Sequence, residues 1–249
     1  MQTLTLFPTC LVENFFPRVA EAAGKVLTRL GYAPQTPRGL TCCGQPAFNA
    51  GHWEEARRMA LHTLKVLEAA EGPVVLPSGS CTAMIRHGYP KLFADDPVNL
   101  PRAQALAERT FEFTEFVWEA RSWDVPPPPP AGEDAPALAY HPSCHLLRQL
   151  GVDRQPKGLL TAAGIRFTAL PPECCGFGGV FAVEQPELSA ELLSRKIADI
   201  EASGARLVTG CDVSCLMHIE GGLRKRGSPV RCVHIAEVLE GRWTVDDRP

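Results

Sequence analysis

Two pairs of adjacent cysteines, each followed by a glycine, are the residues of this chain best suited to chemistry. The pairs lie in Cys42-Cys43-Gly44 and Cys174-Cys175-Gly176. Neighbouring Cα atoms are about 3.8 Å apart, below the roughly 4.4–6.8 Å of a relaxed disulfide, so the members of a pair cannot comfortably bridge each other. Their thiolates can instead bind different metal atoms of one cluster. The glycine can take a positive φ or let the backbone approach that cluster closely.

Each half of the chain adds two more cysteines to its pair, one near a first strand and one after a later strand. Four thiolates from three loops suit an iron–sulfur cluster, because sulfur donors match iron and four of them complete a [4Fe–4S] unit. We therefore expect two [4Fe–4S] clusters, one in each half. The predicted ligands are Cys10, Cys42, Cys43 and Cys81 for the first cluster, and Cys144, Cys174, Cys175 and Cys215 for the second.

Other roles for these residues stay open. Zn²⁺ also accepts four thiolates, so a zinc site in at least one half is the main alternative. Cys232 is expected to be a buried, small apolar side chain. Three histidines, His141, His145 and His234, could donate a hydrogen bond to a cluster sulfur, although a structural role is the more usual one.

The sequence contains an internal repeat in two copies. Three landmarks recur at offsets of 134, 132 and 134 residues, and so regular an offset indicates a duplication. We expect two tandem domains related by pseudo-twofold symmetry, spanning residues 1–123 and 137–249. Residues 124–136, which include five consecutive prolines, are expected to form a semi-rigid linker.

Strands and helices alternate in both halves, which predicts an α/β fold with a mostly parallel sheet and flanking helices in each domain. Ligands gather beyond the carboxyl ends of such strands, so the cysteines should meet there. Helices that begin just after Cys81 and Cys215 would point their positive ends at an anionic cluster. The expected strands are 3–7, 74–76, 137–141, 165–170 and 206–209, and the expected helices are 16–30, 53–70, 154–163 and 187–203.

Composition narrows the class of protein. The chain has 249 residues, 45% of them hydrophobic, and a net charge of −3. This charge provides no basic surface for nucleic acid and no polybasic membrane patch, and no apolar run is long enough to span a bilayer. The first residues lack the features of a signal peptide, so a cytoplasmic location is expected. Ten cysteines in that compartment favour metal or redox chemistry over disulfides.

Several motifs resemble the family of cysteine-rich CCG-domain proteins, which includes the cysteine-rich subunit of heterodisulfide reductase and the iron–sulfur subunit of glycolate oxidase. Within this family the sequence is most similar to the lactate-utilisation protein A group, short proteins made of two CCG repeats. The resemblance covers nearly the whole chain. The motifs that carry it are Tyr140–Cys144, Cys174–Gly179, Asp212–Cys215 and His234–Leu239.

The chain departs from the wider family at two positions. Each repeat of that family ends in Cys-x-x-Cys, and its subunits can bind a noncubane cluster through five cysteines. Ser78 and Asp212 occupy the first position of this motif here. The departure favours four-thiolate sites, with Ser78 or Asp212 as candidate oxygen ligands and Cys211 as a candidate fifth ligand.

The resemblance implies an iron–sulfur subunit of an L-lactate dehydrogenase complex that converts lactate to pyruvate. Its implied partners are two other lactate-utilisation proteins, one of them an iron–sulfur protein of ferredoxin type, with a quinone as candidate acceptor. Those partners could hold the chain at the inner face of the membrane. No catalytic residue is assigned, because the hydride step belongs to a flavin or nicotinamide and the chain lacks G-x-G-x-x-G. A glycolate oxidase subunit, a heterodisulfide-reductase-like thiol–disulfide subunit and a zinc-stabilised scaffold are the alternatives.

Overall fold

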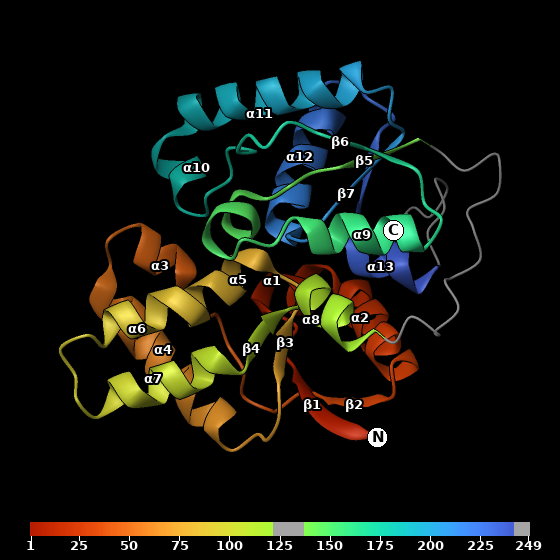
Figure 1. Ribbon diagram of the computed structural model, residues 1–249. Helices are drawn as coiled ribbons and strands as arrows, with labels where there is room; N and C mark the ends of the chain where they lie inside the picture. The colour runs from red at the N-terminus through yellow and green to blue at the C-terminus, as the bar shows by residue number, and fades with distance from the viewer. Residues whose placement is uncertain (122–136, 242–249) are drawn as a thin grey trace.

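The computed structural model describes residues 1–121 and 137–241, which form two parallel sheets with flanking helices (Figure 1). The first sheet has the strand order β2-β1-β3-β4 and the second has the order β6-β5-β7-β8. All strand pairs are parallel, and each repeat places its first strand beside its second and third. The predicted α/β fold with two copies of one unit is thus confirmed. The predicted linker at 124–136 lies outside the described residues.

The first repeat supplies the elements up to residue 120. They are β1 (Gln2–Leu6), α1 (Cys10–Phe15), α2 (Pro17–Arg29), β2 (Tyr32–Gln35), α3 (Gln45–Asn49), α4 (Trp53–Glu68), β3 (Val74–Leu76), α5 (Gly79–Ala83), the π-helix η1 (Met84–Gly88), α6 (Tyr89–Leu92), α7 (Asn99–Glu108), β4 (Thr110–Glu112) and α8 (Phe113–Ala120).

The second repeat supplies the elements from residue 138. They are β5 (Leu138–Tyr140), the π-helix η2 (His145–Gln149), α9 (Arg154–Ala162), β6 (Phe167–Ala169), α10 (Phe181–Glu184), α11 (Pro186–Ala202), β7 (Leu207–Gly210), α12 (Val213–Lys225), β8 (Arg231–His234) and α13 (Ile235–Glu240).

The long amphipathic helices lie where the hydrophobic pattern predicts them. Helix α4 buries Ala56, Ala60 and Leu64 on one face, and Gly72-Pro73 follows its end before the buried strand β3. The edge strand β6 lies within the predicted strand 165–170, but the edge strands β2, β4 and β8 were not identified from the sequence. Strand β2, for example, has no fully buried residue, so it lacks the apolar run that marks a central strand.

Two helices pack across the boundary between the repeats. Helix α8, which follows the last strand of the first repeat, packs against α9 of the second, and α13 packs in the same way against α2. One hydrophobic cluster consequently contains residues of both repeats, among them Leu4, Phe116, Tyr140 and Val238. The two repeats therefore share a core, which fixes one set of cysteines relative to the other.

The α8–α9 contact leads to a prediction about two glycines. A Cβ added at Gly158 of α9 would lie 2.4 Å from the Trp118 ring, whereas one added at Gly221 of α12 would meet no atom of the described chain within 4 Å. Gly158→Ala should therefore lower the free energy of unfolding by about 1–3 kcal/mol through overpacking. Gly221→Ala should raise it by about 0.5–1 kcal/mol, because alanine is the better helix former. Urea denaturation measures both, and equal effects would contradict the close α8–α9 contact.

Helices long and apolar enough to cross a bilayer are absent from the described residues.

Candidate metal centre

All eight predicted ligands line one cavity of about 180 Å³ between the two repeats. The lining comprises Cys10, Cys42, Cys43 and Cys81 of the first repeat and Cys144, Cys174, Cys175 and Cys215 of the second, together with Ser78 and Asp212. Every cysteine of the chain is a free thiol in the structure. The sequence predicted a meeting within each half, but the shared cavity is a product of the tertiary structure.

The cysteines reach the cavity from the carboxyl ends of parallel strands, as expected for an α/β sheet. Cys10 and Cys144 follow β1 and β5, and the two pairs follow β2 and β6. Cys81 and Cys215 correct one expectation, because each lies in the first turn of its helix and not ahead of it. The Oγ of Ser78 caps α5 by accepting from the Cys81 N–H at 3.2 Å. This cap starts the helix before the cysteine and directs Cys81 into the site.

The glycine after each pair closes a turn around the first thiol. Gly44 and Gly176 have φ values of +88° and +91°, and their N–H groups donate to the Sγ atoms of Cys42 at 3.5 Å and Cys174 at 3.4 Å. A Cβ at Gly176 would lie 2.5 Å from the carbonyl oxygen of Ser189 in α11. The positive φ is thus confirmed, and the close approach is made to a helix.

Three glycines with positive φ form a graded test of this turn. Gly151 has φ +68° and open space at its Cβ position within the described structure, whereas a Cβ at Gly44 would lie 3.3 Å from the Ala56 carbonyl. We expect Gly151→Ala to cost about 1 kcal/mol of stability from backbone strain alone. Gly44→Ala should cost more, and Gly176→Ala the most, about 3 kcal/mol, because backbone must move. The urea midpoints of the iron-free variants measure the order, and a Gly176 effect no larger than the Gly151 effect would contradict it.

The thiols of each set interact in chain order and share protons unequally. Hydrogen bonds from Cys10 and Cys43 lower the pKa of the Cys42 thiol, and hydrogen bonds to Cys42 in turn raise the pKa of Cys10 and Cys43. The second set behaves in the same way, with the pKa of Cys174 lowered by Cys144 and Cys175. Cys42 and Cys174 are therefore the favoured thiolates within their hydrogen-bonded groups, and metal binding releases protons from thiol ligands.

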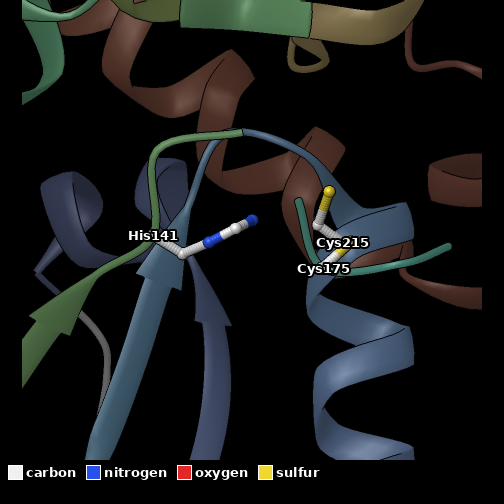
Figure 2. A group of neighbouring side chains, drawn as sticks. All are labelled: His141, Cys175 and Cys215. Atoms are coloured by element: carbon white, nitrogen blue, oxygen red, sulfur yellow. The ribbon is translucent and has the colours of Figure 1, made fainter. Parts of the chain in front are cut away.

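Two histidines accompany the second set of thiols. Buried His141 follows β5 and points toward Cys175 and Cys215, and its ligand nitrogen and their Sγ atoms lie within 4.8 Å of one another (Figure 2). Burial, together with the nearby Lys196, lowers the pKa of His141 to about 3, so its ring is neutral. The Nδ1 of His145 lies 3.6 Å from the Cys144 Sγ. His234 caps α13 instead, accepting from the Ala236 N–H at 3.2 Å.

Asp212 joins the two repeats at the cavity wall. Its carboxylate accepts from the hydroxyls of Ser78 at 2.8 Å, Ser80 at 2.8 Å and Ser143 at 2.9 Å, and from the Ser80 N–H at 3.1 Å. Ser78 and Asp212 are equivalent positions of the duplication, so their direct contact places both next to the pseudo-twofold axis. The sequence marked these residues as departures from a ligand motif but gave no sign that they bind each other.

Cys211 and Cys232 do not line the cavity. The Cys211 Sγ is fully buried, 3.9 Å from the Tyr140 hydroxyl and 4.0 Å from that of Thr114. Glu112 lies next to this group and accepts from Thr114, and burial raises the pKa of its carboxyl to about 8. Cys232 lies on β8 and packs against apolar residues, as predicted, but it is only partly buried. Sequence reasoning missed the Glu112 group, because its members come from strands and helices of both repeats.

The donor set fits a thiolate-ligated iron–sulfur group. Each repeat offers four thiols from three separate segments, and none of these sulfurs forms a disulfide in the described structure. Soft thiolates select iron–sulfur clusters or zinc over hard cations. The residues Cys10, Cys42, Cys43 and Cys81 would hold one group, and Cys144, Cys174, Cys175 and Cys215 the other.

Two parallel sheets that present paired cysteines at one edge define a class of protein, and comparison with known families agrees. The model of the cysteine-rich domain, CCG, matches residues 4–86 and again residues 138–220. The chain therefore belongs to the cysteine-rich domain family. The two matched segments contain every predicted ligand.

Two relatives that match nearly the whole chain are named Lactate utilization protein A. The chain is 43% identical over 244 residues to Lactate utilization protein A of Exiguobacterium sp., covering 96% of this chain and 97% of the relative. It is 41% identical over 247 residues to Lactate utilization protein A of Bacillus velezensis, covering 96% and 99%. A crystal structure of a hypothetical protein from Helicobacter pylori is similar in fold, with a TM-score of 0.69 at 10% identity, over 98% of this chain and 50% of that one.

Proposed function

We propose that the chain is the iron–sulfur electron-transfer subunit of a complex that oxidises L-lactate to pyruvate. The convergence of eight free thiols on one cavity supports this most directly. A cluster held in each set of thiolates would supply one-electron transfer. Full-length similarity to proteins named Lactate utilization protein A supports the substrate.

The shared cavity supports transfer between two neighbouring centres. Because helices α8 and α13 cross the boundary between the repeats, the two sets of thiols are held in a fixed relation. Removal of two electrons as hydride needs a flavin or nicotinamide on a partner. We propose two partners from the lactate-utilisation system, an iron–sulfur protein of ferredoxin type and one further protein. We also propose a quinone as electron acceptor and the cytoplasm as location.

The arrangement of Asp212 supports four-thiolate centres. Its two carboxylate oxygens accept three hydroxyl groups and one N–H, so they are already engaged away from any metal. A fifth cysteine ligand of the heterodisulfide-reductase type would have to stand at this position or at Ser78. We therefore propose two [4Fe–4S] clusters in preference to noncubane clusters. For the same reason we propose electron transfer in preference to disulfide cleavage.

A zinc site in the second repeat is the other candidate, and one observation favours it. His141, Cys175 and Cys215 present one nitrogen and two sulfurs within 4.8 Å of one another, a donor combination that Zn²⁺ accepts in structural sites. With zinc there, the chain would carry one electron-transfer centre and one structural centre.

Anaerobic purification followed by quantification of iron, sulfide and zinc tests the proposal. Two [4Fe–4S] groups predict about eight irons and eight sulfides per chain, with a paramagnetic signal on reduction. Four irons and one zinc would favour the mixed alternative. The substrate is tested in cells that lack this protein, since growth on lactate should fail and return with the wild-type chain only. Iron in the protein with unimpaired growth on lactate would contradict the substrate and leave the electron-transfer role standing.

A further inference from the structure

The two sets of thiols are alike in sulfur but differ in their neighbours. The duplication offset of 134 residues pairs Phe7 with His141 and Leu11 with His145. The second set is thus flanked by two imidazoles where the first has a phenyl ring and an isobutyl group. One backbone donor is shared, because Gly44 and Gly176 donate to the first thiol of each pair at 3.5 and 3.4 Å. The backbone also donates to Cys10 from Leu11 and to Cys175 from Phe177. The two histidines are the side-chain donors that distinguish the second set from the first.

His141 is a polar side chain that lies buried without a hydrogen bond from its ring in the described part of the chain. It is 1% exposed, and neither ring nitrogen has a hydrogen-bond partner among the described residues. Its backbone is fixed, because its N–H donates to the Thr209 carbonyl of β7 at 2.7 Å. Buried polar groups of native proteins are nearly always paired, so an unpaired ring directed at Cys175 and Cys215 indicates a partner that forms at those sulfurs (Figure 2).

His141 approaches these sulfurs from behind the cavity wall. Cys175 and Cys215 line the cavity, whereas His141 does not. Four thiolates already complete a [4Fe–4S] unit, so an imidazole behind them is placed to donate to sulfur and not to replace it. An imidazole ring carries at least one N–H group in either protonation state.

The tautomer of His145 follows from its other contact. Its Nε2 lies 3.4 Å from the Gln45 Nε2, an amide nitrogen that can only donate. With the Gln45 amide in this orientation the His145 Nε2 accepts, which leaves Nδ1 to carry an N–H group. That Nδ1–H lies 3.6 Å from the Cys144 Sγ, in range to donate to it.

We propose that His141 and His145 donate N–H···S hydrogen bonds to the thiolates of the second centre and give it a higher reduction potential than the first. Hydrogen bonds to sulfur draw electron density from a cluster and favour its reduced state. Electrons that enter the pair would then settle on the second centre, so the direction of transfer is set by two substitutions between the repeats. The inference rests on the proposed function, because it needs a reducible group at both sites.

The test is a potentiometric titration of the holoprotein followed by paramagnetic resonance. The variant Cys42→Ser/Cys43→Ser leaves only the second centre and so assigns its signal. In the wild-type background, His141→Phe/His145→Leu copies the neighbours of the first centre. We expect the reduction potential of the second centre to fall by at least 59 mV. For a one-electron couple this corresponds to an at least tenfold weaker preference for the electron. The first centre should keep its potential.

Two further variants separate tuning from packing. His141→Gln keeps an N–H donor and should retain part of the higher potential, and His62→Gln changes an exposed histidine bonded to Gly39 and should shift neither centre. Should His141→Phe lose iron, the wild-type protein labelled with ¹⁵N-histidine decides the matter. Weak hyperfine coupling between a histidine nitrogen and the second centre would support a hydrogen bond from histidine to sulfur. Strong coupling, as from a nitrogen that binds iron directly, or the absence of coupling, would overturn the proposal.

A failure of the histidine proposal and a failure of the proposed electron-transfer function give different results. Equal potentials of two iron-loaded centres, or unshifted potentials in the double histidine variant, would overturn this inference and leave the electron-transfer role intact. A wild-type chain without iron would overturn the proposed function, and the inference with it.

Discussion

Replacing Cys174 and Cys175 by serine should halve the iron of the purified chain, from about eight atoms to about four. The pair supplies two of the four thiols of the second set, and serine is too poor a ligand for iron to hold the group in place. Cys42→Ser/Cys43→Ser should do the same to the first set. Electron transfer through the complex should then be abolished by either change, because each interrupts a chain of two centres.

A half-buried cysteine away from the cavity is the matched control. Cys232 lies on β8 and does not line the cavity, so Cys232→Ser should keep all of the iron. Iron, sulfide and zinc are measured on the same anaerobic samples. Retention of eight irons in the Cys174→Ser/Cys175→Ser variant would contradict the assignment of the second set, and loss of all eight would show that the two centres assemble together.

Replacing Asp212 by alanine should destabilise the iron-free chain by about 3 kcal/mol. The substitution removes the acceptor of three hydroxyl groups and one N–H, drawn from Ser78, Ser80 and Ser143, and leaves them buried without it. Hydrogen bonds to a charged group contribute about 1.5–3 kcal/mol each, and relaxation of the hydroxyls returns part of that sum. Denaturation in urea measures the effect.

The control for Asp212 is a carboxylate in a partly exposed ion pair. Asp153 pairs with Lys157 one helical turn away, at 2.7 Å, with both side chains partly exposed. Asp153→Ala should therefore cost less than about 0.5 kcal/mol. Similar losses for the two variants would mean that the Asp212 network does not hold the repeats together, and the contact between positions 78 and 212 would lose its structural role.

The pattern of the sequence predicted the central elements well and the outer ones poorly. Helices α4 and α11 and strands β3 and β7 carry clear apolar faces or apolar runs, so their positions follow from local periodicity. The edge strand β2 is short and has no fully buried residue, and its pairing with β1 places it in the sheet. Local patterns cannot report such pairing.

The start of the helices at Cys81 and Cys215 illustrates the same limit. The sequence predicts helices near these residues, but the first residue of α5 depends on whether Ser78 caps it. The Ser78 side chain also donates to Asp212 of the other repeat. A cap that depends on a contact across 134 residues is decided only when the two repeats meet.

The sequence by itself determined which atoms could bind metal and how many sets they form, because residue type and a constant duplication offset are written into the chain. It also determined that the sets face the same edges of their sheets, since cysteines that follow parallel strands must lie at the carboxyl ends. Only the tertiary structure decided that both sets open into one cavity, that Asp212 joins the repeats there, and that His141 stands unpaired behind Cys175 and Cys215. These depend on how α8 and α13 pack across the boundary, and packing between distant segments is a property of shape that no local pattern contains.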